Sequence, residues 1–179
     1  RYLRERGIRG PLPPTLRYGM LRHSDTDLLL PCMVGAVQRA PDRAVVALHR
    51  TFLTITGSAV IRAAVTSPRK MLGSVRGGAV RLAAAEPEMA IGEGIETCLS
   101  YQRATGISTW AALSAAGVVN VVLPPLPAAA VVHLLVDLDP AGEAACAAAA
   151  ERLSREGRKV RLARPVGGAD FNDALVRHA

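Results

Sequence analysis

The second half of the sequence alternates short apolar runs with helical segments, and this alternation restricts the fold more than any other feature. Strands are predicted over 88–93, 131–139 and 158–165, with shorter apolar segments over 108–113 and 118–124 around a small helix or turn. Helices are predicted over 95–106, 140–157 and 170–178. Pro140 opens the longest of these helices and Gly157 follows it, where each residue type is favoured. Strands that alternate with helices predict an α/β fold with a doubly wound, mainly parallel sheet.

The first half of the sequence is less regular. A short helix is predicted over 1–7, and strands over 28–38, 43–55 and 58–65, separated by turn residues. The segment 67–83 alternates basic residues with glycine and ends in a further strand. We therefore predict a basic α+β N-terminal subdomain over 1–87, followed by the doubly wound domain over 88–179.

Charge is distributed unevenly between these two halves. Residues 1–87 hold 14 Lys and Arg against 5 Asp and Glu, whereas residues 88–179 hold 8 against 10. A gene rich in G and C accounts for most of the preference for arginine over lysine, but it does not account for the asymmetry. A basic half beside an acidic half suggests that one binds a polyanion and the other a cation.

Several classes of protein are disfavoured by composition. No apolar run reaches the roughly 18 residues that a membrane-spanning helix needs, and no signal peptide opens the chain. Cys32, Cys98 and Cys146 are far apart and form no CxxC pair, which argues against a zinc site or a disulfide framework and fits a reducing cytoplasm. The opening without an initiator methionine suggests a piece of a longer protein. We expect a cytoplasmic protein without membrane association.

Acidic residues stand at the carboxyl ends of two predicted strands. Glu93 ends the strand over 88–93, and Asp137 and Asp139 end the strand over 131–139. Ligands of parallel α/β sheets bind beyond these strand ends, and residues i and i+2 of a strand point to the same side. Carboxylates about 4 Å apart repel by roughly 4 kcal/mol at an effective dielectric constant near 20. A divalent cation such as Mg²⁺ removes that repulsion, so the pattern predicts a metal site.

A structural role for one of these aspartates is an alternative. Asp139 precedes Pro140 and a long helix, so it could serve as an N-cap, which contributes about 1 kcal/mol. Asp137 lies too early in the sequence to cap that helix, and capping leaves it unexplained.

These motifs together resemble the Toprim domain, a metal-binding catalytic fold of bacterial-type primases, topoisomerases and some nucleases. The matching residues are Glu93-Gly94, then Asp137-x-Asp139-x-x-Gly142, then Asp170 and Asp173 in GADFNDAL. The resemblance covers residues 88–179. Residues 1–87 look like the segment that precedes Toprim in primase-like proteins of phages, plasmids and other mobile elements.

The resemblance implies roles for the acidic residues. Glu93 would be a metal ligand or general base, Asp137 and Asp139 would bind Mg²⁺ or Mn²⁺, and Asp170 would be an auxiliary ligand. Gly94 and Gly142 would allow a phosphate or a neighbouring strand to approach the backbone closely. Glu96 is either a further acidic group of the site or a first-turn glutamate favoured by the helix dipole.

Basic residues of the first half are candidate contacts for nucleic acid or nucleotide. The set is His49, Arg50, Arg69, Lys70, Arg76 and Arg81. They would contact template phosphates or an incoming triphosphate. Taken singly, each is at least as well explained as a solvated charge, and His49 as a structural strand histidine. Aromatic residues make up only 3%, so backbone contacts should dominate over base stacking. Trp110, Tyr101 and His133 are expected to be buried in the core.

The resemblance therefore implies the catalytic fragment of a DNA primase, a nucleotidyltransferase that makes RNA primers on single-stranded DNA from NTPs. A zinc-binding module upstream and a helicase domain or partner would complete the protein. A Toprim nuclease and a non-catalytic nucleic-acid-binding module remain alternatives. A topoisomerase is disfavoured, because none of Tyr2, Tyr18 and Tyr101 has the setting of a nucleophile.

Overall fold

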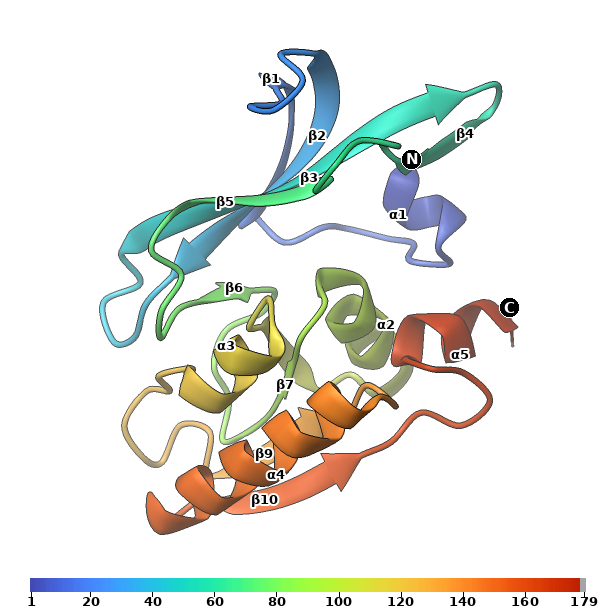
Figure 1. The fold of residues 1–179 in the computed structure, drawn as a ribbon. Coiled ribbons are helices and arrows are strands. Elements are labelled where there is room, and N and C mark those ends of the chain that lie inside the picture. The colour runs from blue at the N-terminus through green and yellow to red at the C-terminus, as the bar shows by residue number, and fades with distance from the viewer. Residues whose placement is uncertain (178–179) are drawn as a thin grey trace.

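The computed structural model describes residues 1–177, which form one ten-stranded sheet with helices on its faces (Figure 1). The strand order is β10-β9-β7-β8-β6-β2-β3-β4, with β1 also paired to β2 and β5 also paired to β3. Parallel and antiparallel strands thus share one sheet, with the antiparallel strands at the top of Figure 1 and the parallel strands below.

The second half of the chain forms the predicted doubly wound sheet. Its parallel strands are β7 (Glu88–Gly92), β8 (Ser108–Ala111), β9 (Val131–Leu135) and β10 (Lys159–Ala163). Its helices are α2 (Ile95–Thr105), α3 (Ala115–Asn120), α4 (Pro140–Arg155) and α5 (Phe171–Arg177). Successive side chains of β7 point to opposite faces, so Ala90 packs in the cluster with α2 and α5, and Met89 packs with α3 and α4. The α/β prediction is confirmed.

The first half forms a curved antiparallel sheet that is continuous with the parallel one. Its elements are α1 (Tyr2–Glu5), β1 (Leu16–Arg22), β2 (Leu29–Gln38), β3 (Val45–Thr56), β4 (Ala59–Arg62), β5 (Arg69–Gly73) and β6 (Ala79–Arg81). Strand β6 joins the two halves, because it pairs with β2 on one side and with β8 on the other. Helix α1 lies between the antiparallel strands and the helices α2 and α5 (Figure 1). The boundary at residue 87 falls between β6 and β7, and the division into two domains stays a prediction.

Two strands of the first half have no counterpart in the sequence-based assignment. Strand β1 exposes Tyr18 and Met20, and most of β5 is exposed as well. Strands with so little burial carry no clear alternation of apolar and polar residues, which is the signal used to recognise strands. Backbone pairing with β2 and β3 therefore defines β1 and β5.

The predicted strand over 131–139 is too long. Strand β9 ends at Leu135, and the N–H of Asp139 donates to the carbonyl of Asp137 at 2.8 Å, so the chain turns there. Pro140 then begins α4. The two aspartates consequently belong to a turn, and the expectation that they project together from one strand is wrong.

Buried polar groups stabilise the core of the second half. Trp110 and Tyr101 are buried, as expected, and His133 contacts the Tyr101 hydroxyl at 2.6 Å and the Glu88 carboxylate at 2.9 Å. None of the helices in residues 1–177 is both long and apolar enough to cross a membrane.

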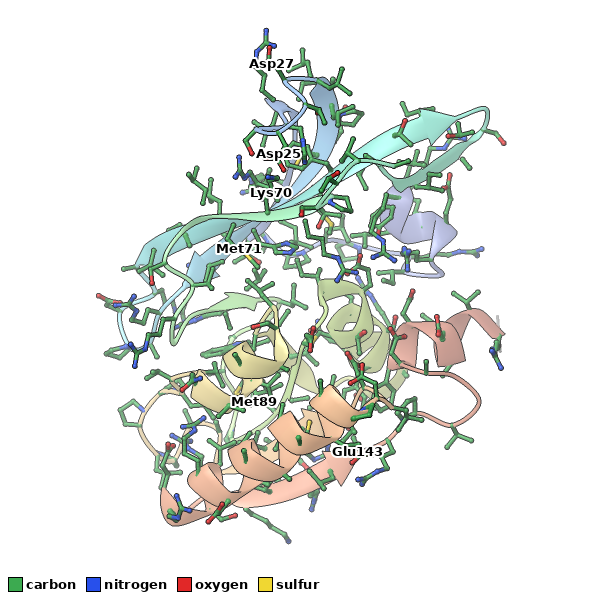
Figure 2. The ribbon with its side chains drawn as sticks, viewed as in Figure 1. Asp25, Asp27, Lys70, Met71, Met89 and Glu143 are labelled. Carbon is green, nitrogen blue, oxygen red and sulfur yellow. The ribbon has the colours of Figure 1, made fainter. Side chains whose placement is uncertain are left out.

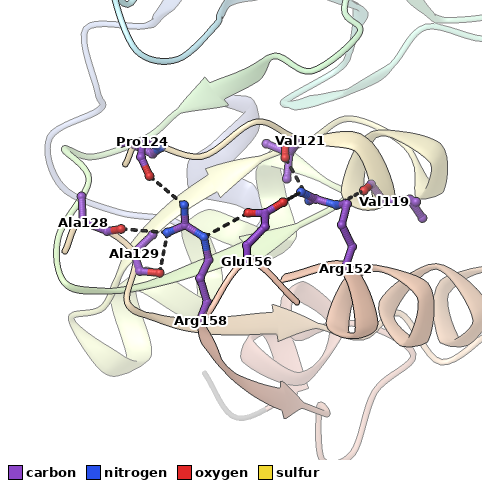
Figure 3. Close-up of polar contacts among 8 residues, drawn as sticks. All are labelled: Val119, Val121, Pro124, Ala128, Ala129, Arg152, Glu156 and Arg158. Carbon is purple, nitrogen blue, oxygen red and sulfur yellow. Dashed lines mark hydrogen bonds and ion pairs between the residues drawn. The ribbon is translucent and has the colours of Figure 1, made fainter. Parts of the chain in front are cut away.

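Two arginines hold the irregular segment between α3 and β9 (Figure 3). Arg158 is 8% exposed, and its guanidinium donates to the carbonyls of Pro124, Ala128 and Ala129 at 2.7–2.9 Å. Arg152 donates to the carbonyls of Val119, in the last turn of α3, and of Val121, and Glu156 pairs with both arginines. The segment is therefore fixed to the C-terminal end of α4.

Candidate functional site

Acidic side chains line one pocket at the carboxyl ends of β7 and β9. Glu93 follows β7 directly and Asp137 follows β9 by two residues, and these strands are parallel neighbours. Both side chains line a pocket of about 270 Å³, together with Asp170 and Asp173 from the start of α5. The topology therefore brings together carboxylates from three distant parts of the chain.

Burial and the charges of neighbouring carboxylates raise the pKa values of Glu93 and Asp137. Burial, together with the neighbouring charges of Glu93, Asp170 and Asp139, raises the pKa of Asp137 to about 6. Burial and the charge of Asp139 also raise the pKa of Glu93, and Arg69 opposes both shifts. The pocket therefore holds several carboxylates in a partly buried environment.

One oxygen of Asp137 has no partner within the described chain. Its Oδ1 is buried and forms no hydrogen bond. Helix α4 packs closely against this residue, because a Cβ atom on Gly142 would lie 2.5 Å from the Asp137 carbonyl oxygen. Gly142 therefore allows α4 to pack closely against Asp137. The buried Oδ1 of Asp137, which has no hydrogen-bond donor in the described chain, is available to a cation.

The residues present fit a hard divalent cation such as Mg²⁺. Within residues 1–177, no three Asp, Glu, His or Cys side chains converge into a complete metal site. Mg²⁺ does not need such a site, since it usually takes one or two carboxylates and completes its shell with water and substrate phosphates. Glu93 and Asp137 are the carboxylates that would hold it, because both are half-buried and face the same pocket.

Two other predicted ligands also have structural roles. Asp139 is the N-cap of α4, where its Oδ1 accepts from the N–H of Gly142 at 2.8 Å. Asp170 Oδ1 accepts from the N–H groups of Asn172 and Asp173, both at 2.8 Å. One carboxylate oxygen of Asp139 and one of Asp170 therefore accept hydrogen bonds from the backbone. The assignment of these two residues as metal ligands stays a prediction.

Basic residues line the same pocket across from the carboxylates. They are Arg6, after α1, His49 on β3, Arg62 on β4 and Arg69 on β5. Within the described chain, neither Arg62 nor Arg69 forms an ion pair with a carboxylate at 4 Å or less. Their charges are consequently available to an anion in the pocket.

The other predicted basic contacts lie outside this pocket. Lys70 pairs with Asp25 at 2.5 Å, and Figure 2 shows the two side chains near the hairpin of β1 and β2. Arg50 donates to the carbonyl of Met71 at 3.3 Å, and Arg76 is exposed. Arg81 is buried, with its guanidinium 4.3 Å from the centre of the Trp110 ring. Contacts of these four residues with nucleic acid stay predictions.

The pocket also contains Arg6 and Arg62, which the sequence did not single out, and Glu96, for which the sequence left two roles open. Arg6 reaches the pocket because α1 packs beside α2. Arg62 reaches it because β4 pairs with β3, where Arg62 lies opposite Leu53. Glu96 accepts a hydrogen bond of 2.7 Å from the Tyr2 hydroxyl. Burial alone would raise the pKa of Glu96, but this bond and the nearby arginines lower it below its ordinary value. Of these residues only Glu96 carried a signal, its place beside the Glu93-Gly94 motif.

Comparison with protein families identifies the second half. The model of a family described as Toprim domain matches residues 88–179, just over half of the chain. The chain belongs to the Toprim family. A second model, described as a domain of unknown function (DUF7146), matches residues 1–82 of this Toprim protein. No curated protein sequence matches the chain.

Three solved structures with a similar fold come from primases. The primase fragment of the bacteriophage T7 primase-helicase protein has a TM-score of 0.57 and 16% identity, over 90% of this chain and 63% of that one. The zinc-binding and RNA polymerase domains of Aquifex aeolicus primase have a TM-score of 0.56 and 17% identity, over 98% and 51%. The DnaG primase catalytic domain bound to ssDNA has a TM-score of 0.55 and 16% identity, over 99% and 68%.

These similarities confirm the Toprim-like fold of the second half, and the matched regions also include the first half of the chain. At 16–17% identity they establish the fold alone. The chain spans 63% of the T7 fragment and about half of the Aquifex aeolicus primase fragment.

Proposed function

We propose that this chain is the catalytic region of a DNA primase, which makes RNA primers on single-stranded DNA with Mg²⁺ or Mn²⁺. The observation that carries the proposal is a single pocket with half-buried carboxylates on one wall and arginines without ion pairs on the other. Such a pocket suits a nucleoside triphosphate and its metal ion, because it offers charges of both signs at short range.

Each wall of the pocket has a part in nucleotidyl transfer. In that reaction a 3′-hydroxyl attacks the α-phosphorus of an NTP and pyrophosphate leaves. A bound divalent ion lowers the pKa of the hydroxyl and stabilises charge on the phosphates. Asp137 would hold the ion, and Glu93 would either hold it together with Asp137 or accept the hydroxyl proton. Arg62 and Arg69 would bind the triphosphate and balance its charge.

The proposed partners follow from the same reaction. They are single-stranded DNA and NTPs, with a zinc-binding module and a helicase domain or partner in the full-length protein. The similar structures support this proposal, since they are a fragment of a primase-helicase, a primase fragment with a zinc-binding domain and a DnaG domain bound to ssDNA. A cytoplasmic location is proposed because all three cysteines are buried and free.

Phosphodiester cleavage is the second candidate function. The acidic pocket supports it equally, because a nuclease needs the same metal-binding carboxylates. A module that only binds nucleic acid is disfavoured, since clustered half-buried carboxylates would repel a polyanion and destabilise the fold without a compensating ligand.

One assay separates these functions. The protein is incubated with single-stranded DNA, labelled NTPs and Mg²⁺ or Mn²⁺, with Asp137→Asn as the inactive control. Labelled oligoribonucleotides that depend on template support the primase, and shortened template supports the nuclease. Binding of DNA with neither product, in the full-length protein, would refute both.

A further inference from the structure

Asn172 connects α5 to the residue that follows α1. Its side chain is buried, and the residue is 3% exposed. Its Oδ1 accepts from the Arg6 guanidinium at 3.1 Å, and its Nδ2 donates to the Arg6 carbonyl at 2.9 Å and to the Ser100 hydroxyl at 3.0 Å. A guanidinium only donates and a carbonyl only accepts, so this position needs a side chain that does both. An amide meets that requirement, whereas an ionised carboxylate, which only accepts, does not.

The residue that Asn172 holds carries a positive charge into the pocket. Arg6 lines the same pocket as Glu93 and Asp137. Within the described chain, Arg6 forms no ion pair with a carboxylate at 4 Å or less. Its guanidinium contacts the Asn172 amide and lies 5.0 Å from the centre of the Tyr2 ring. Both contacts are with neutral groups, so they orient the guanidinium and leave its charge available to an anion.

The backbone of Asn172 is bonded to the acidic side of the pocket. Its N–H donates to Asp170 Oδ1 at 2.8 Å, and Asp170 and Asp173 line the pocket beside it. One residue is thus bonded both to a carboxylate and to a guanidinium of the same pocket. Asn172 therefore sets the position of Arg6 relative to the acidic residues.

We propose that Asn172 is a positioning residue, which holds Arg6 in the pocket as a contact for a phosphate group. The inference rests on the proposed function, because it places a nucleotide or a template phosphate in this pocket. Arg6 would touch the phosphate, and Asn172 would act through Arg6 alone. The phosphate belongs either to a nucleoside triphosphate or to the backbone of single-stranded DNA, since both offer the same acceptor oxygens to a guanidinium.

A double-mutant cycle on ligand affinity tests this proposal. ATP with Mg²⁺ and, separately, single-stranded oligo(dT) are titrated into the wild type, Arg6→Met, Asn172→Ala and the double variant. Arg6→Met should weaken binding of at least one of these ligands by about tenfold, the effect of one hydrogen bond to a charged group. The ligand that is affected identifies the source of the phosphate. Asn172→Ala should weaken the same ligand, and the double variant should lose no more affinity than Arg6→Met alone.

Asn172→Asp is a second probe of the same contact. It keeps an acceptor for the Arg6 guanidinium but places a negative charge beside it, so the guanidinium would no longer offer its full charge to a phosphate. It should weaken the affected ligand at least as much as Asn172→Ala does.

Ser100→Ala is the matched control. It removes a hydrogen bond of the same amide without touching Arg6, and Ser100 is 1% exposed. It should lower the melting temperature, as Asn172→Ala does, but leave both affinities within about twofold of the wild type. Thermal melting checks that each variant is folded, and if Asn172→Ala unfolds, Asn172→Ser replaces it in the cycle.

Two results would overturn the proposal. Losses that add in the double variant would show that Asn172 acts independently of Arg6. Wild-type affinity of Arg6→Met for both ligands would show that Arg6 contacts no phosphate. Both results are affinities and need no turnover, so they are distinct from a failure of primer synthesis, which would refute the proposed function and leave the cycle measurable.

Discussion

Replacement of Asp137 by Asn should stabilise the metal-free protein at neutral pH. The pKa of this carboxyl rises from an ordinary value of 3.8 to about 6, so at pH 7 the folded state holds a charge that its surroundings disfavour. That rise in pKa corresponds to roughly 3 kcal/mol, and solvent screening at this half-buried site reduces the effect to about 1–2 kcal/mol. For a chain of this length, the melting temperature should rise by about 2–8 °C.

The pH dependence of this effect has a definite sign. Because the folded-state pKa is raised, ionisation of Asp137 removes stability as the pH rises from about 4 to about 6. Below about pH 4 the wild-type carboxyl is protonated in both states, so the advantage of Asp137→Asn should vanish there. Excess Mg²⁺ should reverse the order at pH 7, since only the wild type retains the ligand.

Thermal melts at pH 4 and pH 7, with EDTA or with Mg²⁺, measure all of these effects. Asp173→Asn is the matched control, because Asp173 lines the same pocket but is exposed, and its melting temperature should change little. Loss of stability in metal-free Asp137→Asn at pH 7 would refute the reasoning that the carboxylates repel one another.

Two further predictions concern the arginines. Arg158→Met should destabilise the protein by about 3 kcal/mol in denaturant unfolding, because three carbonyls would lose their donor. Arg155 is exposed, so Arg155→Met should change the free energy of unfolding by less than about 0.5 kcal/mol. Similar losses in both variants would contradict the stabilising role of the buried Arg158 hydrogen bonds. Single-stranded DNA should bind more weakly as salt rises, and Arg69→Ala should reduce the slope of log K against log salt by roughly one unit while Arg155→Ala leaves it unchanged. An unchanged slope in Arg69→Ala would remove Arg69 from the phosphate-binding surface.

The sequence predicted the acidic wall of the pocket but only part of the basic wall. Glu93 and Asp137 were predictable, because parallel neighbouring strands bring their carboxyl ends to one edge of the sheet. Arg62 was not, since only the register of β4 against β3 turns it toward the pocket. Arg6 is distant in sequence from the acidic residues of the pocket, and the packing of α1 brings it to them.

The turn around Asp139 shows how a correct motif can accompany a wrong local structure. The apolar run over 131–136 continues into Asp137 without a break in pattern, so the strand was predicted to continue. Capping of α4 by Asp139 and the turn at Asp137 instead end it at Leu135. Motif order therefore located the site, whereas hydrogen bonds from backbone N–H groups orient the Asp139 and Asp170 carboxylates.

Anomalous diffraction from crystals soaked in Mn²⁺ tests the central claim most directly, because it locates a bound cation without relying on activity. The account predicts one strong peak within bonding distance of the Glu93 and Asp137 carboxylates, and its loss in crystals of Asp137→Asn. A peak elsewhere, or none at the pocket while the protein remains folded, would contradict the claim that these carboxylates form a metal site.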